Sequence, residues 1–138
     1  MATRSPPARP LSPHLSIWKW GPHMLVSILH RATGSAMATA GTVLFVWFLL
    51  ALAAGKDAYG AFLDPFTYST GHLNIVGYIF GIGLTWAFTQ HMLSGIRHFF
   101  LDTGAGYELK TAKLTATATL VGSVILTALF WAYLVWGK

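Results

Sequence analysis

The chain contains no cysteine, and few of its residues are charged. The lack of cysteine excludes disulfides, Cys-ligated iron–sulfur clusters, thiolate nucleophiles and a haem attached through Cys-x-x-Cys-His. Charged residues make up 9% of its 138 residues, against about 25% in a typical soluble domain. Hydrophobic residues make up 54%, so an ordinary water-soluble domain and a disordered chain are both excluded. The length is sufficient for one domain or one small bundle.

Long uncharged runs separate the charged residues into groups. Asp, Glu, Lys and Arg are absent from residues 32–55, 65–96 and 114–137, which are runs of 24, 32 and 24 residues. A helix of about 24 residues spans about 36 Å, and a bilayer core is about 30 Å thick. The sequence therefore predicts an all-α membrane protein with three transmembrane helices, at about residues 25–54, 69–100 and 112–136. The alternative for the first run is a signal sequence, but the run is longer than the 7–15 apolar residues of such segments.

Basic residues predict how these helices are oriented. One side carries Arg4, Arg9, Lys19, Arg31, Arg97, Lys110 and Lys113, and the other carries Lys56 and Lys138. The positive-inside rule then gives a cytoplasmic N-terminus and an outward C-terminus. Four prolines interrupt residues 1–21, so this N-terminal segment is expected to be irregular and to lie on the cytoplasmic (matrix) side, before a transmembrane domain at 22–138. The net charge of +5 is accounted for by topology, and no nucleic-acid partner is expected.

A first polar cluster lies near the inner end of the first helix. Ser27, His30 and Arg31 are spaced i, i+3 and i+4, so they share one helical face. In one interpretation Arg31 extends to lipid headgroups and Ser27 bonds to its own helix. In the other, the hydroxyl, imidazole and guanidinium line a pocket that binds a carbonyl or carboxylate arriving from the bilayer.

A second polar cluster lies near the inner end of the second helix. His91 and His98 are seven residues apart, within about 20° of one face and about 10.5 Å apart along the axis. That distance is too large for one zinc ion, whose bonds to histidine are about 2.0 Å, but it suits opposite ends of a larger ligand. Ser94 and Gly95 lie between them on that face, and Gly95 allows a flat group to approach the helix. An ion pair between Arg97 and Asp102 is expected at the helix end.

His91 is the residue from which a cofactor is inferred. It lies about 16 Å from the helix end at Asp102, well inside the hydrocarbon, where the sequence offers no ionic partner on the same helix. A buried histidine is more often a satisfied core residue than a ligand. Axial ligation of a haem iron nevertheless accounts for a neutral imidazole in an apolar site, with Arg97 and His98 close to the propionates. A second axial ligand would have to come from a partner membrane subunit. The Gly77–Gly81 pair is expected to allow close helix packing only.

The two clusters belong to longer motifs that resemble a known family. Residues 9–15 (RPLSPHL) and 27–34 (SILHRATG), together with the pattern His91-x-x-x-Gly95-Ile96-Arg97-His98-Phe99-x-x-Asp102, resemble the cytochrome b556 membrane-anchor subunit of succinate dehydrogenase. The form of the first motif resembles the alphaproteobacterial and mitochondrial branch of that family. The likeness extends from about residue 9 to the C-terminus, and both motifs occur in order on the expected helices.

The resemblance implies a role in respiratory complex II. It implies haem b ligated by His91 and by a histidine of a second hydrophobic anchor subunit, with His30, Arg31, Arg97 and His98 near the propionates. It implies a ubiquinone site lined by Ser27 and Arg31. FAD and iron–sulfur clusters would lie on partner flavoprotein and iron–sulfur subunits, so no residue of this chain would oxidise succinate. The expected location is the inner membrane of a bacterium, in the alphaproteobacterial branch, or of a mitochondrion.

Two alternatives remain open from the sequence. The chain could be a purely structural anchor without haem. It could also anchor a fumarate reductase that uses a low-potential quinol.

Overall fold

The structure is a computed structural model that describes residues 18–137. The described helices are α1 (Pro22–Ala36), η1 (Met37–Gly41), α2 (Thr42–Ala54), α3 (Lys56–Leu63), α4 (Ile75–Asp102) and α5 (Leu109–Trp136). Extended pairing in this part of the chain is limited to one isolated bridge between Thr67 and Leu73. The predicted all-α class is confirmed. Of the predicted irregular segment 1–21, residues 1–17 lie outside the described part.

The first predicted helix is one long helix made of α1, η1 and α2. Pro22 occupies its first turn, where a missing N–H costs nothing. The helix ends at Gly55, whose φ of 99° is a conformation that favours glycine. Between these ends the five residues Met37–Gly41 form a π-helical turn. The observed bounds, 22–54, agree with the predicted 25–54.

The predicted start of the second helix, at residue 69, is wrong. Residues 64–74 form a turn-rich segment in which Asn74 organises the start of α4 at Ile75. The Asn74 side chain accepts a hydrogen bond from the Gly77 amide at 2.9 Å and donates one to the Pro65 carbonyl at 3.1 Å. This N-cap satisfies an amide that would otherwise lack a partner, and it was missed because absence of charge alone does not locate a helix end. The short helix α3 was also not predicted.

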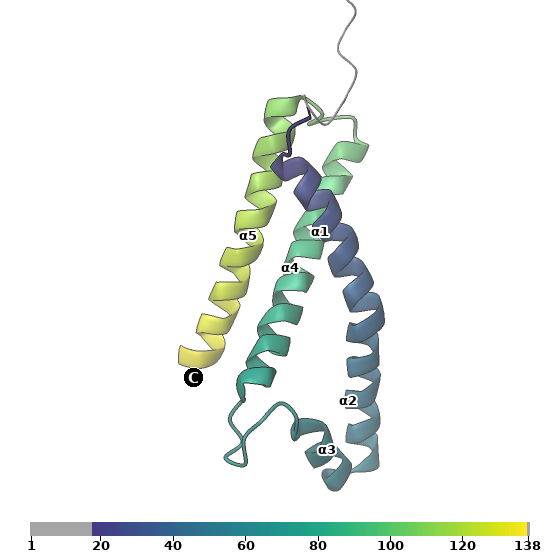
Figure 1. Cartoon of the computed structure of the whole chain (residues 1–138), viewed down its shortest axis with the longest axis vertical. Coiled ribbons are helices and arrows are strands. Elements are labelled where there is room, and N and C mark those ends of the chain that lie inside the picture. Colours follow the sequence, from purple (N-terminus) through teal and green to yellow (C-terminus); the bar gives the residue numbers. More distant parts are fainter. Residues whose placement is uncertain (1–17, 138) are drawn as a thin grey trace, which may run out of the picture.

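The helices form a splayed bundle (Figure 1). Helices α4 and α5 run side by side, and α1 packs against both of them. Beyond the π turn, α2 diverges from α4, and the chain leads back to α4 through α3 and the turn-rich segment. As a result the start of α1, the end of α4 and the start of α5 meet at one end of the molecule. Both predicted polar clusters lie at that end.

The interior of the bundle is small and polar. The buried apolar residues of the described chain are Val26, Ala51, Ala87 and Ala116, and the buried polar residues are Thr33, Thr89, Gln90, Ser94, Thr119, Ser123 and Thr127. Hydroxyl groups connect α4 to α5, because Thr89 Oγ1 lies 3.0 Å from Thr127 Oγ1 and donates toward the Ser123 carbonyl at 3.3 Å. Small side chains let helices approach closely, and interhelical hydrogen bonds hold membrane helices together.

The exterior, in contrast, is apolar. Large hydrophobic side chains on every long helix are exposed, among them Val43 (68%), Ile79 (64%) and Leu129 (61%). The joined helix Pro22–Ala54 (33 residues) and helix α5 (28 residues) are long and apolar enough to cross a membrane, and they contain 18-residue stretches with mean hydropathies of 2.1 and 2.0, respectively. Helix α4 is as long as α5 but does not reach the same apolarity, because its second half carries both histidines and Arg97.

Of Gly77 and Gly81, which were expected to allow close packing between helices, only Gly81 does so. A Cβ built on Gly81 would lie 2.7 Å from Trp131 Cζ2 of α5, so Gly81 allows a close helix–helix contact. Gly77 instead packs against the carbonyl of Phe66 in the preceding segment. Trp131 is held in place by its indole N–H, which donates to Thr85 Oγ1 at 3.3 Å.

We predict that Gly81→Ala destabilises the bundle by about 1–3 kcal/mol, because the added methyl must displace the Trp131 ring and break its hydrogen bond to Thr85. The matched control is Gly83→Ala on the same helix, where a Cβ meets no atom within 4 Å. Thermal unfolding of the purified assembly checks the prediction. Equal melting temperatures for the two variants would contradict it.

Candidate functional site

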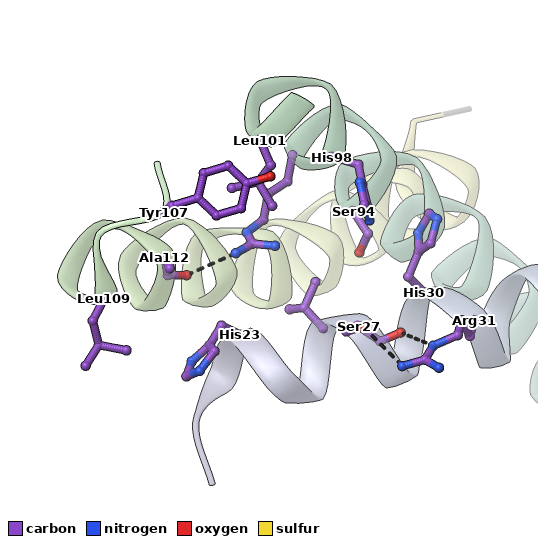
Figure 2. Close-up of a pocket in the computed structure, with 12 residues that line it drawn as sticks. His23, Ser27, His30, Arg31, Ser94, His98, Leu101, Tyr107, Leu109 and Ala112 are labelled. Atoms are coloured by element: carbon purple, nitrogen blue, oxygen red, sulfur yellow. Dashed lines mark hydrogen bonds between the residues drawn. The ribbon is translucent and has the colours of Figure 1, made fainter. Parts of the chain in front are cut away.

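A cavity of about 540 Å³ opens where α1, α4 and α5 meet (Figure 2). Its lining residues are His23, Val26, Ser27, His30, Arg31, Ser94, Arg97, His98, Leu101, Tyr107, Leu109 and Ala112. Hydroxyl, imidazole and guanidinium groups contribute its polar atoms, and no Asp or Glu of the described part of the chain lines it. A cavity that is rich in donors and lacks carboxylates suits a ligand with acceptor oxygens.

On the α1 wall the structure brings together the three predicted residues. Arg31 Nη2 donates to Ser27 Oγ at 3.3 Å, and Arg31 Nε donates to the Ser27 carbonyl at 3.4 Å. Both side chains are exposed and lie at the rim. His30 is half-buried, and its Nδ1 has no hydrogen-bond partner in the described chain. The back-bond from the Ser27 hydroxyl to its own helix, expected in one of the two interpretations, is not formed.

On the α4 wall, Arg97 and His98 take different roles. Arg97 Nε donates to Thr115 Oγ1 at 3.1 Å and its Nη2 donates to the Ala112 carbonyl at 3.4 Å, so Arg97 ties α4 to α5. The predicted ion pair between Arg97 and Asp102 is therefore wrong. Asp102 instead lies 3.9 Å from His98 Nδ1, one turn earlier, and both of these side chains are largely exposed. The spacing i, i+4 brings His98, and not Arg97, over Asp102.

His91 lies outside the cavity lining and contacts it through His30. The two imidazoles stack with centroids 4.0 Å apart and planes at 7°. His91 Nδ1 lies 3.0 Å from the His30 carbonyl oxygen and 3.4 Å from Thr33 Oγ1. A carbonyl only accepts, so Nδ1 carries the proton, and in a neutral ring the lone pair is then on Nε2. His98 is further away, with its centroid 6.0 Å from that of His30.

Gly34 makes this arrangement possible, although the sequence analysis gave it no role. A Cβ on Gly34 would lie 2.7 Å from His91 Cε1 and 3.1 Å from Nδ1. The signal that could have identified it is its position four residues after His30, on the polar face of α1. At Gly95, in contrast, a Cβ would lie 3.9 Å from His30 Cε1, which is an ordinary contact, so this glycine is not required for the stack.

Three further polar residues line the cavity beyond the predicted site residues. Ser94 was expected on the same face as His91 and His98, whereas His23 and Tyr107 were not predicted. His23 lies in the first turn of α1, and its Nδ1 is buried without a partner among residues 18–137. Tyr107, in the segment between α4 and α5, lines the cavity although it is largely exposed, and buried Ser94 lines its α4 wall. His23 could have been identified from its position four residues before Ser27, which places both on the same face of the helix. Tyr107 lies between helices, so helical spacing could not identify it.

Comparison with known proteins identifies the family. The succinate dehydrogenase/fumarate reductase transmembrane subunit family matches residues 5–130. The chain belongs to this family. It is 38% identical over 121 residues to the succinate dehydrogenase cytochrome b556 subunit of Paracoccus denitrificans, covering 88% of each chain. It is 33% identical over 127 residues to the subunit of the same name in Rickettsia conorii, covering 89% of this chain and 90% of the relative.

A mitochondrial relative is also found. The mouse succinate dehydrogenase cytochrome b560 subunit is 32% identical over 117 residues, which cover 85% of this chain and 66% of the relative. The matched regions include both polar motifs, because the family match spans residues 5–130. The sequence-based assignment to this family is thus confirmed.

We predict that Thr115→Val loosens the contact between α4 and α5 by about 1.5–3 kcal/mol, because the Arg97 guanidinium loses a hydrogen-bond acceptor. The control is Thr117→Val on the same helix, since the exposed Thr117 hydroxyl bonds only to the Lys113 carbonyl. Thermal unfolding of the purified assembly measures both variants. A Thr115→Val assembly as stable as the control would show that the Arg97 contact contributes nothing to stability.

Proposed function

We propose that this chain is a membrane-anchor subunit of succinate:ubiquinone oxidoreductase, that it forms part of the ubiquinone-reduction site, and that it binds haem b together with a second anchor subunit. The observation that carries the proposal is the donor-rich cavity with no lining carboxylate, in which residues from both polar motifs converge. The names of the relatives support it, because they identify succinate dehydrogenase and a cytochrome.

Three membrane-spanning helices with the N-terminus inside are part of this proposal. The middle span would be α4, whose 28 residues extend about 42 Å and whose interior-facing side carries the polar residues. Polar and ionisable groups in a span are tolerated where they face the bundle. The positive-inside rule puts the cavity end, with Arg31, Arg97, Lys110 and Lys113, on the cytoplasmic or matrix side.

At the quinone site, the residues at the rim would bind and polarise the substrate. Ser27 Oγ accepts a hydrogen bond from Arg31, so its own hydrogen remains available for a quinone carbonyl oxygen. Negative charge develops on the quinone oxygens as they gain electrons. Arg31 would stabilise that charge, and a hydrogen bond from a charged donor contributes about 1.5–3 kcal/mol.

His91 has the chemistry of a haem ligand. Histidines that bind metals commonly donate the other ring N–H to a backbone carbonyl, which fixes the tautomer, and His91 makes this contact with His30. The unpartnered Nδ1 of His30 is one donor suited to a propionate, and Arg31, Arg97 and His98 supply further donors at the same end. When bound, a haem with histidine ligands would supply one-electron chemistry.

The proposed assembly contains a second anchor subunit, an iron–sulfur subunit and a flavoprotein subunit with FAD, which oxidises succinate. The exposed apolar surface would contact lipid and the second anchor. The basic cavity end would face the iron–sulfur subunit. The proposed location is the inner membrane of a bacterium of the alphaproteobacterial branch, or of a mitochondrion.

Two experiments separate this function from its alternatives. An absorption spectrum of the assembly, oxidised and then reduced with succinate, separates it from a haem-free anchor. A comparison of high- and low-potential quinones as substrates separates it from a fumarate reductase anchor.

We predict that His91→Ala weakens or abolishes the absorption band of the reduced haem, because one axial ligand is lost. The control is His72→Ala, since His72 is exposed in the turn-rich segment at the opposite end of α4. Spectra of the purified assembly reduced with succinate provide the measurement. An unchanged band in His91→Ala would remove His91 as the ligand.

We predict that Arg31→Ala lowers kcat/KM for quinone reduction about ten- to a hundredfold, the loss expected for a hydrogen bond from a charged donor. The rate is normalised to succinate oxidation by a soluble dye in the same sample. Lys113→Ala is the control, because Lys113 is an exposed cation near the same end but outside the cavity lining. Equal loss of quinone and dye activities in Arg31→Ala would indicate failed assembly in place of a quinone-site defect.

A further inference from the structure

Ser94 is a buried hydroxyl in the cavity wall that the proposed mechanism does not yet use. It projects from α4 opposite Ser27 and Arg31 (Figure 2), and only 2% of its surface is exposed. Ser27 lies at the rim, whereas Ser94 lies deeper. A ligand that enters past Ser27 and Arg31 therefore meets Ser94 on the opposite wall.

Ser94 differs from most helical hydroxyls of the described chain in its hydrogen bonding. The others typically donate to a carbonyl of the preceding turn, as Thr33 does to Leu29 at 2.7 Å and Ser123 does to Leu120 at 2.8 Å. Ser94 makes no such bond in the described chain. Its one protein contact is as an acceptor, from Gln90 Nε2 at 3.0 Å. The hydroxyl hydrogen of Ser94 is thus left without an acceptor in this part of the protein.

Gln90 accounts for this unusual state. It is fully buried, with 0% of its surface exposed, and its Nε2 is directed to Ser94 while its Oε1 has no partner in the described chain. Burial of a side-chain amide costs free energy unless the amide makes a hydrogen bond in return. By donating to Ser94 Oγ, Gln90 occupies a lone pair of the hydroxyl and leaves Ser94 as a donor.

The same arrangement occurs on the α1 wall. Ser27 Oγ accepts from Arg31, four residues later, and Ser94 Oγ accepts from Gln90, four residues earlier. In both cases a neighbour on the same helix occupies the oxygen and the hydrogen remains free. Two hydroxyl donors on facing walls therefore line one cavity.

We propose that Ser94 is a second hydroxyl donor to a carbonyl oxygen of the quinone head, positioned by Gln90. The inference rests on the proposed function. It assigns Ser94 to binding of the substrate and Gln90 to positioning of Ser94. A quinone has oxygens at two ends of its ring, so donors on facing walls would fix the orientation of the head within the cavity.

The test measures KM and kcat for a short-chain ubiquinone in the intact purified complex, with each rate normalised to dye-linked succinate oxidation. We expect Ser94→Ala to raise KM about three- to tenfold, the loss expected for one neutral hydrogen bond, with a smaller change in kcat. Gln90→Leu should raise KM in the same direction, because Ser94 becomes free to donate to its own helix. The control is Ser123→Ala, since Ser123 is equally buried but donates to Leu120.

An unchanged KM in Ser94→Ala overturns the inference. If Ser94→Ala lowers the yield of complex, Ser94→Cys decides the matter in the same way, because it nearly preserves the volume and weakens the donor. Arg31→Ala separates the role of Ser94 from the existence of the quinone site. A quinone defect in Arg31→Ala without one in Ser94→Ala rejects only the role of Ser94, and normal quinone reduction in both rejects the proposed ubiquinone site on this chain.

Discussion

The contact on which the polar end of this molecule depends is the hydrogen bond from His91 Nδ1 to the carbonyl of His30, at 3.0 Å. It joins α1 to α4 and fixes the tautomer of one imidazole. It also holds the second imidazole against it, with 7° between the planes. Gly34 leaves room for this stack, and His30 in turn forms part of the cavity wall. His30 in the cavity wall and His91, the proposed haem ligand, therefore lie at the same contact between α1 and α4.

In the rest of the bundle, the distribution of side chains between inside and outside suits a lipid environment. In a soluble protein large apolar side chains fill the core, whereas here they cover the outside and the buried positions are small or hydroxylated. Burial of apolar surface contributes little to association between helices in lipid, so close packing and interhelical hydrogen bonds must supply the stability. The contacts of Thr89 with Thr127 and of Arg97 with Thr115 are bonds of this kind, and they make α4 and α5 the tightest pair.

Much of the fold followed from where charges are absent, because a bilayer imposes length and apolarity on each span. The long helices were predicted within a few residues except for the start of α4, which depends on the Asn74 cap, a local contact that hydropathy does not report. Helical spacing correctly grouped Ser27, His30 and Arg31. It failed for Arg97, because the partner of a long flexible side chain is decided by the neighbouring helix, and α5 offered Thr115 and Ala112. It placed Ser94 on the face of His91 and His98 but could not show how its hydroxyl is bonded, because the contact with Gln90 depends on the side-chain conformations.

The π turn at Met37–Gly41 has a consequence for how the first span varies in length. Such a turn is a local insertion of one residue into an α-helix, and each α-helical residue turns the chain by about 100°. Because the wide turn takes up the extra residue locally, deletion of one residue there would restore regular bonding and leave the residues beyond it facing the same directions. The first span can therefore change in length by one residue at Met37–Gly41 without turning α2 relative to the histidine stack on α1.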